Sequence, residues 1–478
     1  MVKRQKNHSR KRRNSKRFDG ISAKARKINA STPVDVCEEQ LSPFGGLLGF
    51  IKFLDLVDFK NLFHETYRSP SREPKLGHYY MVLGILLLLI IGFNRIWHFV
   101  YIGLDSILCG IFRVHRLPAA STYWRYLDSL GINQAHSLLN TMSRLRSRVW
   151  ERCGTNYRHI TVDIDTTVET VYGNQQGGRK GHNTKHRGKK GYRPILCFIP
   201  QTREYLWGSL RKGETVSGAE TAKVIRTLRR HIPSCVKTVL IRGDAEFMSW
   251  SSVEAALQEG YDFIFANKQC EPIFNQSAWY RIRRRTEDGE FNSCMYQPTG
   301  WEQPLRFVAM RIPKAPTARK PVQCELFEEN RYLYRIFCTT LGGKAHDVIA
   351  TYDKRADVEN LVGEAKREGL DAIPSGRFKN NHAFFQIAML AYNLWRYYKM
   401  LAQLCDAKVP RFADVKDNTI RIARLKLLMI AAKVVRPGNR DKVKYSIHDT
   451  RTPGLLIFYE FLDRLRFEKN EVCNASIY

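Results

Sequence analysis

The stretch TYDKRADVENLVGEAK, Thr351 to Lys366, predicts a helix with a distinctive polar face. Tyr352, Arg355, Glu359 and Lys366 stand at offsets 0, 3, 7 and 14. At about 100° per residue, these side chains fall within an arc of roughly 60°. The apolar stripe beside them, which can lie against a core, comprises Val358, Leu361, Val362 and Ala365. A merely solvated charged face is the alternative interpretation.

A single carboxylate flanked by cations on a rigid helix suits phosphate chemistry. The acid of Glu359 can hold a divalent metal, while Arg355 and Lys366 can hold phosphate oxygens. One carboxylate rarely holds catalytic magnesium alone. Further acids are therefore expected from elsewhere in the chain.

Two predicted strands supply such acids. In HITVDIDTTVETVYG, residues 159–173, apolar and polar residues alternate, which predicts a strand with Asp163 and Asp165 on one face. In TVLIRGDAEF, residues 238–247, a buried strand delivers Asp244 at its carboxyl end. Ligands in open α/β sheets bind at such ends. Taken singly, each aspartate could simply cap a turn.

Together, DIDTT, RGD followed by AEF, and the pattern Y-x2-R-x3-E-x6-K resemble a known family over about residues 80–405. They resemble the DDE transposases of bacterial insertion sequences, in the group that shares the Tyr-Arg-Glu-Lys (YREK) motif. The resemblance implies an α/β fold. It would be a ribonuclease-H-like mixed sheet flanked by helices, with a β-rich insertion before the catalytic Glu and helical N- and C-terminal regions.

The resemblance also implies a catalytic and metal-binding set. Carried over by position, this set is Asp165, Asp244 and Glu359, which would bind two Mg²⁺ ions, with Mn²⁺ able to substitute. Asp163 is the rival for the first place and could instead support the site from behind. We prefer Asp165 because two threonines follow it directly.

The activity that the resemblance implies is that of a Mg-dependent DNA transposase. It would cut at the terminal inverted repeats of its insertion sequence and join the 3′-hydroxyl ends to target DNA, with a hairpin at the donor end. Arg355 and Lys366 would neutralise phosphate charge, and Tyr352 would hydrogen-bond a phosphate. Two alternatives stay open: a non-catalytic DNA-binding protein derived from a transposase, and a metal-dependent nuclease without strand transfer.

Composition agrees with a nucleic-acid partner. The 78 Lys and Arg residues exceed the 46 Asp and Glu residues, which leaves a formal charge of +32. Such a chain should bind double-stranded DNA with a steep salt dependence. The partners expected are the terminal repeats, target DNA and, because two ends must be brought together, a second copy of the chain. The expected location is the bacterial cytoplasm, on DNA.

A basic, glycine-rich loop follows the first strand. The segment GGRKGHNTKHRGKKGYR, residues 177–193, has no acid and predicts a flexible loop close to the scissile phosphate. A role in contacting the DNA backbone follows from its charge. The candidate contact residues are Arg179, Lys180, Lys185, Arg187, Lys189 and Lys190.

The gap of 115 positions between Asp244 and Glu359 is too long for a simple core connection, and strand-like runs at 304–313 and 331–340 fill it. For Trp279 and Trp301, which fall in this gap, core packing is the favoured interpretation. The predicted regions are a basic disordered arm (1–30), a helical DNA-binding region (31–150), a first segment of the catalytic core (151–270), a β-rich insertion (271–340), a second segment of the catalytic core (341–405) and a basic helical region (406–478).

Three further helices are predicted. The apolar run 79–93 is too short to span a bilayer and is expected to be a buried core helix, as is 382–403 beneath the active site. Residues 117–131 predict a short helix with Ser121 as N-cap. In a helix-turn-helix, this last helix would place Tyr123, Arg125 and Tyr126 on DNA.

Overall fold

The computed structural model describes residues 28–69, 71–181, 186–214, 216–282, 289–313, 332–405 and 414–475. The chain divides into two compact units, 1–39 and 40–478. In the first unit, the side chain of Asn29 accepts a hydrogen bond from the backbone N–H of Ser31 at a turn. The basic arm predicted for residues 1–30 lies almost wholly outside the described residues. All elements below belong to the second unit.

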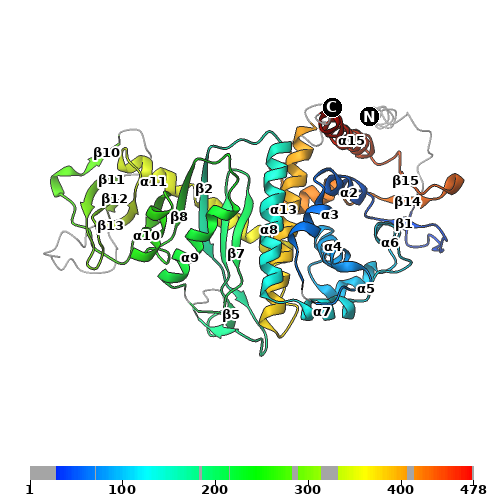
Figure 1. Ribbon diagram of the computed structural model, residues 1–478, viewed down its shortest axis with the longest axis horizontal. Helices are drawn as coiled ribbons and strands as arrows, with labels where there is room; N and C mark the ends of the chain where they lie inside the picture. Colours follow the sequence, from blue (N-terminus) through cyan, green and yellow to red (C-terminus); the bar gives the residue numbers. More distant parts are fainter. Residues whose placement is uncertain are drawn as a thin grey trace, which may run out of the picture. The chain divides into compact units, whose positions relative to one another are not determined.

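A mixed sheet forms the centre of the second unit (Figure 1). Strands β2 (His159–Thr166), β8 (Thr238–Gly243) and β9 (Asp262–Ala266) run parallel to one another. On the other side of β2, β6 (Ile195–Ile199) and β7 (Glu204–Ser209) add antiparallel strands. The strand order is thus β7-β6-β2-β8-β9, and β6 is buried along its whole length. Such continuous burial requires cover on both faces.

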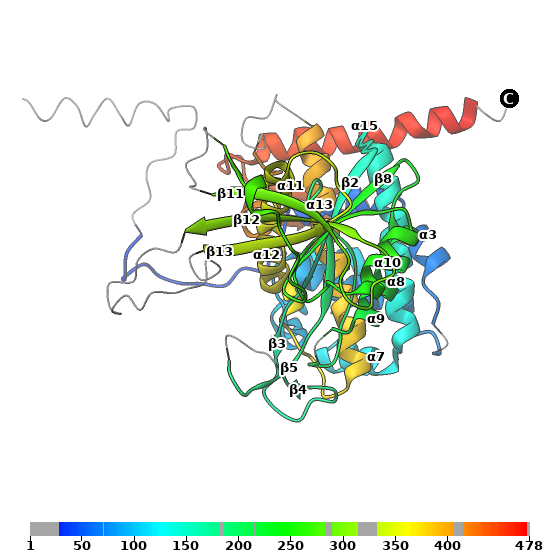
Figure 2. The ribbon, with the colours of Figure 1, turned by 90° about the vertical axis from the view of Figure 1, so that its left-hand side faces the viewer.

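The strand-rich segment between β9 and Thr351 continues the same sheet. Strand β13 pairs antiparallel with β9, and the order then runs outward through β12, β11 and β10. Within the described residues these strands are β10 (Tyr280–Arg281), β11 (Glu290–Tyr296), β12 (Leu305–Pro313) and β13 (Tyr332–Thr339). Figure 2 shows β11, β12 and β13 side by side. The strands predicted at 304–313 and 331–340 are confirmed.

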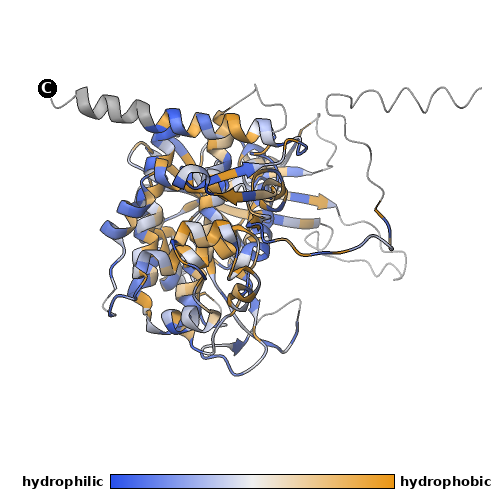
Figure 3. Cartoon of the chain, turned by 90° about the vertical axis from the view of Figure 1, so that its right-hand side faces the viewer, coloured by the Kyte–Doolittle hydropathy of each residue, from blue (hydrophilic) through white to orange (hydrophobic). Residues whose placement is uncertain are grey.

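Helices cover the sheet. On one side, α9 (Gly218–Leu228) packs on α10 (Trp250–Gln258), and the Ser249 hydroxyl caps α10. Beyond β7, the long helices α8 (Ile132–Arg152) and α13 (Phe378–Leu404) run side by side (Figure 1). Nearly every residue of α13 is buried, which confirms the core helix predicted at 382–403. Many helices and strands carry both hydrophobic and hydrophilic residues (Figure 3), whereas β6 is apolar throughout.

Short helices precede α8 and pack into one core with α13. They are α2 (Leu47–Leu56), α3 (Phe59–Thr66), α4 (Gly77–Ile90), the 3₁₀ turn η2 (Ile96–His98), α5 (Phe99–Ile102), α6 (Ser106–Phe112) and α7 (Ala120–Ser129). The interior helix predicted at 79–93 is confirmed, because α4 is buried from Met81 to Ile90. Among the described residues, no helix combines the length and apolar character needed to cross a bilayer.

Two details predicted for the 117–131 segment are wrong. The N-cap of α7 is Ala119 rather than Ser121, and no side chain caps this end. Tyr123 and Tyr126 are buried, and the ring of Tyr123 stacks on Phe99 with centroids 3.9 Å apart. These two aromatic side chains therefore support the helical core and are not available to DNA.

The chain after α13 returns to the N-terminal helices. Strand β14 (Ala432–Val435) pairs with both β1 (Leu41–Ser42) and β15 (Lys442–Tyr445), and α15 (Thr452–Ala475) contacts α2. Helix α14 (Ile420–Leu427) contacts α13. The fold class predicted from the sequence is confirmed: the protein is α/β, with a large mixed sheet flanked by helices. The division into six regions stays a prediction.

Candidate active site

Asp165 and Asp244 lie at the carboxyl ends of neighbouring parallel strands. Asp165 is the penultimate residue of β2, and Asp244 directly follows β8. Because these strands pair in parallel, their carboxyl ends meet at one edge of the sheet. Burial raises the pKa of Asp165 to about 6; the cation of Arg355 opposes this rise, and the negative charge of Asp244 adds to it. The two predicted aspartates are thus brought together.

Asp163, the rival for the first place, has a different environment. Its side chain is fully buried, and its two oxygens accept hydrogen bonds from Nε and Nη2 of Arg242 at 2.6 and 2.8 Å. The third guanidinium nitrogen, Nη1, donates to the carbonyl of Thr351 at 2.5 Å. Arg242, itself in β8, therefore joins this strand to β2 and to Thr351. Both oxygens of Asp163 are engaged, which leaves Asp165 as the carboxylate open to a ligand.

The single helix predicted for Thr351–Lys366 is wrong. Helix α11 (Ala345–Asp353) ends one residue after Tyr352, Lys354 and Arg355 form a turn, and α12 (Ala356–Ala365) follows. Arg355 at this break donates from Nη2 to the Ile164 carbonyl at 2.8 Å and to Asp165 Oδ1 at 3.0 Å. The break between α11 and α12 thus coincides with a contact between Arg355 and β2, which lies far away in the sequence.

The other two residues expected to contact phosphate have protein partners. Tyr352 packs on Phe337 with ring centroids 4.4 Å apart, and its pKa is raised mainly by burial. Lys366, at the start of a π-helical turn (Lys366–Leu370), donates to the Val168 carbonyl at 2.8 Å and lies 3.2 Å from Glu169 Oε1. Arg355 and Lys366 therefore tie both ends of α12 to the end of β2 and the residues that follow it.

Glu359 is exposed on α12, four residues after Arg355. Residues four apart on a helix are neighbours, so Glu359 lies one turn from the arginine that contacts Asp165. Among the described residues, no three His, Cys, Asp or Glu side chains are grouped as a set that could hold a metal ion. The structure thus brings two of the three predicted acids together and leaves Glu359 outside their immediate contact.

The carboxylate oxygens of Asp165 and Asp244 are the type of ligand that a Mg²⁺ ion prefers. Such ions take oxygen ligands and are usually bound through one or two carboxylates plus substrate phosphates. Asp165 and Asp244 provide this pair, and the raised pKa of Asp165 indicates a carboxylate that lacks full compensation for its burial. An incoming cation would supply that compensation.

Glu246 is a site residue that sequence reasoning missed. Its Oε2 accepts hydrogen bonds from Thr166 Oγ1 at 3.0 Å and Arg193 Nη2 at 2.6 Å, and its Oε1 accepts the Val216 N–H at 3.1 Å. Its own N–H donates to Asp244 Oδ1 at 3.0 Å. Glu246 therefore fixes the end of β2 relative to the loop that carries Asp244. The only signal in the sequence is its place in DAEF, two residues after the aspartate.

The basic segment after β2 is more ordered than the predicted flexible loop. Strands β3 (Glu169–Thr170), β5 (Lys190–Tyr192) and β4 (Arg179–Lys180) form a small separate sheet (Figure 2). Gly191 permits the close pairing, because a Cβ there would lie 2.9 Å from the Glu169 carbonyl oxygen. The exposed cations are Arg179, Lys180, Arg187, Lys189 and Lys190. Arg179 forms an ion pair with Glu214 at 2.7 Å; Lys185 lies outside the described residues.

The two tryptophans of the β-rich segment pack on protein. Trp301 contacts Trp250 and Phe307, with ring centroids 5.5 and 6.5 Å apart. The guanidinium of Arg311 lies over the ring of Trp279 at 4.2 Å. The packing role preferred from the sequence is confirmed for both.

Comparisons with known proteins give one family and several remote structural likenesses. A family model described as transposase DDE domain group 1 matches residues 91–467. No curated protein matches the sequence. The piggyBac transposase synaptic complex with hairpin DNA shares 11% identity over 80% of each chain, with a TM-score of 0.42. The Mos1 strand transfer complex shares 13% identity over 41% of this chain and 60% of that one, with a TM-score of 0.17.

Proposed function

This chain belongs to the transposase DDE domain group 1 family, and on that premise we propose that it is the cut-and-paste enzyme of a bacterial insertion sequence in the YREK group. It cuts at the terminal inverted repeats of its element and joins the 3′-hydroxyl ends to target DNA, with a hairpin at the donor end. The observation that carries the proposal is the meeting of Asp165 and Asp244 at the ends of adjacent parallel strands.

In this proposal Asp165, Asp244 and Glu359 hold two Mg²⁺ ions, for which Mn²⁺ can substitute. Bound metal would activate the attacking oxygen and stabilise the leaving oxygen of the phosphodiester. Because Glu359 is exposed and one turn from Arg355, a side-chain rotation or a small shift of α12 could bring its carboxylate to the aspartates. The metal-binding arrangement would then form when DNA and metal are present.

The cations of the site have two roles in this proposal. Arg355 orients Asp165 through their 3.0 Å contact and is placed to neutralise phosphate charge when metal takes over the carboxylate. Lys366 holds the end of β2 through the Val168 carbonyl, and Tyr352 would hydrogen-bond a phosphate. The exposed cations of the β4–β5 segment would contact the DNA backbone close to the cut.

DNA cutting and joining can be tested directly. The protein is incubated with Mg²⁺ and DNA carrying the ends of its own element, alongside Asp165→Asn, Asp244→Asn and Glu359→Gln. We expect wild type to cut and join as a homodimer on paired ends. Each variant should lose at least about a thousandfold in cutting, since removing one metal ligand disables the transfer, while DNA binding measured by gel shift is kept.

Asp353→Asn provides the matched control, because Asp353 is an exposed acid of α11 that pairs with Arg335. It should cut at the wild-type rate. Cutting without joining would identify a nuclease without strand transfer. DNA binding without any cutting would identify a non-catalytic derivative of a transposase. An active Glu359→Gln would show that the third ligand is another residue.

A further inference from the structure

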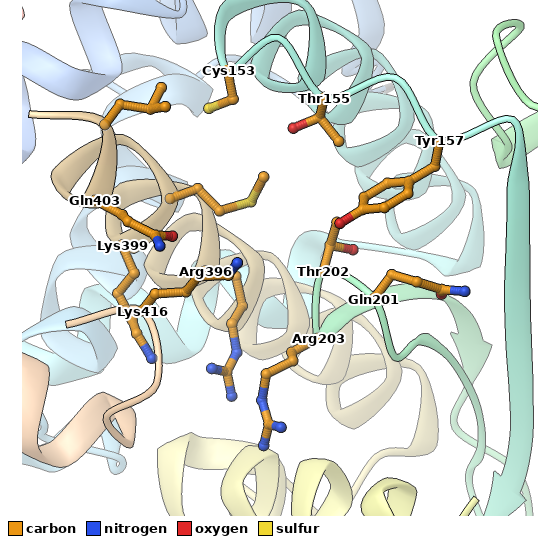
Figure 4. Close-up of a pocket in the computed structure, with 12 residues that line it drawn as sticks. Cys153, Thr155, Tyr157, Gln201, Thr202, Arg203, Arg396, Lys399, Gln403 and Lys416 are labelled. Atoms are coloured by element: carbon orange, nitrogen blue, oxygen red, sulfur yellow. The ribbon is translucent and has the colours of Figure 1, made fainter. Parts of the chain in front are cut away.

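A cavity of about 370 Å³ is lined by residues that do not belong to the candidate active site (Figure 4). Its walls come from the end of α8 and the residues after it, the β6–β7 turn, the last turns of α13 and the segment that precedes α14. Gln201 of the turn accepts the Thr161 N–H at 3.3 Å, early in β2. Asp165 lies four residues further on, roughly 13 Å along the strand. The cavity is therefore a second site.

The lining of this cavity is cationic. Arg203, Arg396, Lys399 and Lys416 contribute to it, and none of the described residues that line it is an acid. Neutral donors complete the wall, among them the Tyr157 and Thr155 hydroxyls (Figure 4). Cations with hydroxyl and amide donors, and no carboxylate, form a set suited to an anion with several acceptor oxygens.

Two of the cations are buried and act on each other. Burial and then the charges of Arg396 and Arg203 lower the pKa of Lys399 to about 7. Burial and then the charge of Arg203 lower the pKa of Arg396 to about 9. Arg396 is held by Glu364 and by the Tyr392 hydroxyl, and Lys399 Nζ donates to the Asn418 carbonyl. The positive charges thus lie close enough to repel, and a bound anion would relieve that repulsion.

Arg203 has an unfavourable backbone conformation. Its φ of 57° is left-handed, a conformation that glycine adopts readily and a side chain adopts with strain. The turn closes through the Arg203 N–H to the Pro200 carbonyl at 3.3 Å. The guanidinium is only loosely paired, at 3.8 Å from Asp357. A strained residue that carries a loosely held cation into a cavity points to a ligand for that cation.

We propose that this cavity binds a phosphate group through Arg203, Arg396, Lys399 and Lys416. The volume exceeds what one phosphate needs, so the ligand is a phosphate carried on a larger molecule, either the backbone of DNA or a free nucleotide. Arg203 and Lys416 are the more exposed pair of these four cations. The inference goes beyond the proposed function, since it requires no cutting of DNA.

Inorganic phosphate titrated into the full chain by calorimetry tests the proposal. Wild type should bind one phosphate per chain with saturation. The double variant Arg203→Gln/Lys416→Gln should bind at least about tenfold more weakly, because two charge-assisted hydrogen bonds are lost. Both side chains reach solvent, so the fold should survive, and a melting curve without phosphate checks this. The control Arg230→Gln/Lys237→Gln removes the same charge from exposed positions outside the cavity and should bind like wild type.

Absence of saturable binding in wild type, or equal weakening in both double variants, would overturn the proposal. Competition then identifies the source of the phosphate. Displacement by a short DNA duplex indicates a backbone phosphate, whereas displacement by a deoxynucleoside 5′-monophosphate alone indicates a free nucleotide. Either displacement upholds the cavity as a phosphate site, and displacement by neither overturns it.

Discussion

Strand β2 carries two aspartates on one face, two residues apart, and their surroundings differ. Asp163 is fully buried and shares both oxygens with Arg242. Asp165, with 17% of its side chain exposed, meets one nitrogen of Arg355 and the like charge of Asp244. Burial raises the pKa of both carboxylates, but both oxygens of Asp163 accept hydrogen bonds from a guanidinium, whereas only one oxygen of Asp165 does. On one strand, therefore, the number of hydrogen-bonded oxygens distinguishes a carboxylate held fully within the protein from one that stays partly open.

The two aspartates should differ most in how much each contributes to the stability of the fold. Asp163→Asn leaves Arg242 buried without its counter-charge and should lower the free energy of unfolding by about 3–5 kcal/mol. Asp165→Asn should change it by no more than about 1 kcal/mol at pH 7.5 without metal, because this side chain is partly exposed and only one of its oxygens contacts Arg355. Urea unfolding of the two variants and wild type measures both values. Equal losses would remove the distinction between the two acids.

A smaller effect is expected from the residue that positions Asp244. Glu246→Gln weakens the contact with Arg193 and loosens the loop between β8 and α10, so cutting should slow by about 10- to 100-fold. Mn²⁺ affinity should fall as well, while DNA binding stays unchanged. Glu254→Gln on the adjacent helix, where the side chain accepts from Gln258, is the matched control and should be silent. A Glu246→Gln protein with wild-type Mn²⁺ affinity would limit Glu246 to a purely structural role.

The sequence predicts the helices and strands around the two aspartates better than it predicts the contacts that these aspartates make. Strand β2, strand β8 and the interior helices α4 and α13 could be predicted because their hydrophobic period is local. The partner of Asp163 could not, since Arg242 lies 79 positions away and is recognised only when β2 and β8 pair. The same holds for the break before α12, where Arg355 reaches a strand 190 positions earlier.

The remaining residues of the site show the same limit. Glu246 looks like any turn acid until its four hydrogen bonds are assembled from separate segments. The position of Glu359 relative to the aspartates depends on how α12 lies over the sheet, which helical periodicity does not specify. Residue types and spacing thus identify which acids to consider, whereas tertiary contacts determine which of them is open.

The smallest effect concerns pH and involves Asp165 alone. A metal needs the ionised carboxylate, and the pKa of Asp165 is about 6, so the carboxylate is mostly ionised at pH 7.5 and about one-tenth ionised at pH 5. Mn²⁺ should therefore bind about tenfold more weakly at pH 5 than at pH 7.5, as measured by calorimetry. Asp165→Asn should bind weakly at both values and lose this pH dependence.

The stability of the metal-free chain should run the other way. Because the folded-state pKa of Asp165 lies above its ordinary value, the stabilising contribution of its protonated form is fully present below about pH 4. That contribution is lost as the pH rises through about 6, the range in which metal binding strengthens. Saturating Mn²⁺ should consequently raise the melting temperature more at pH 7.5 than at pH 5. An equal rise at both values would show that a carboxylate other than Asp165 controls metal binding.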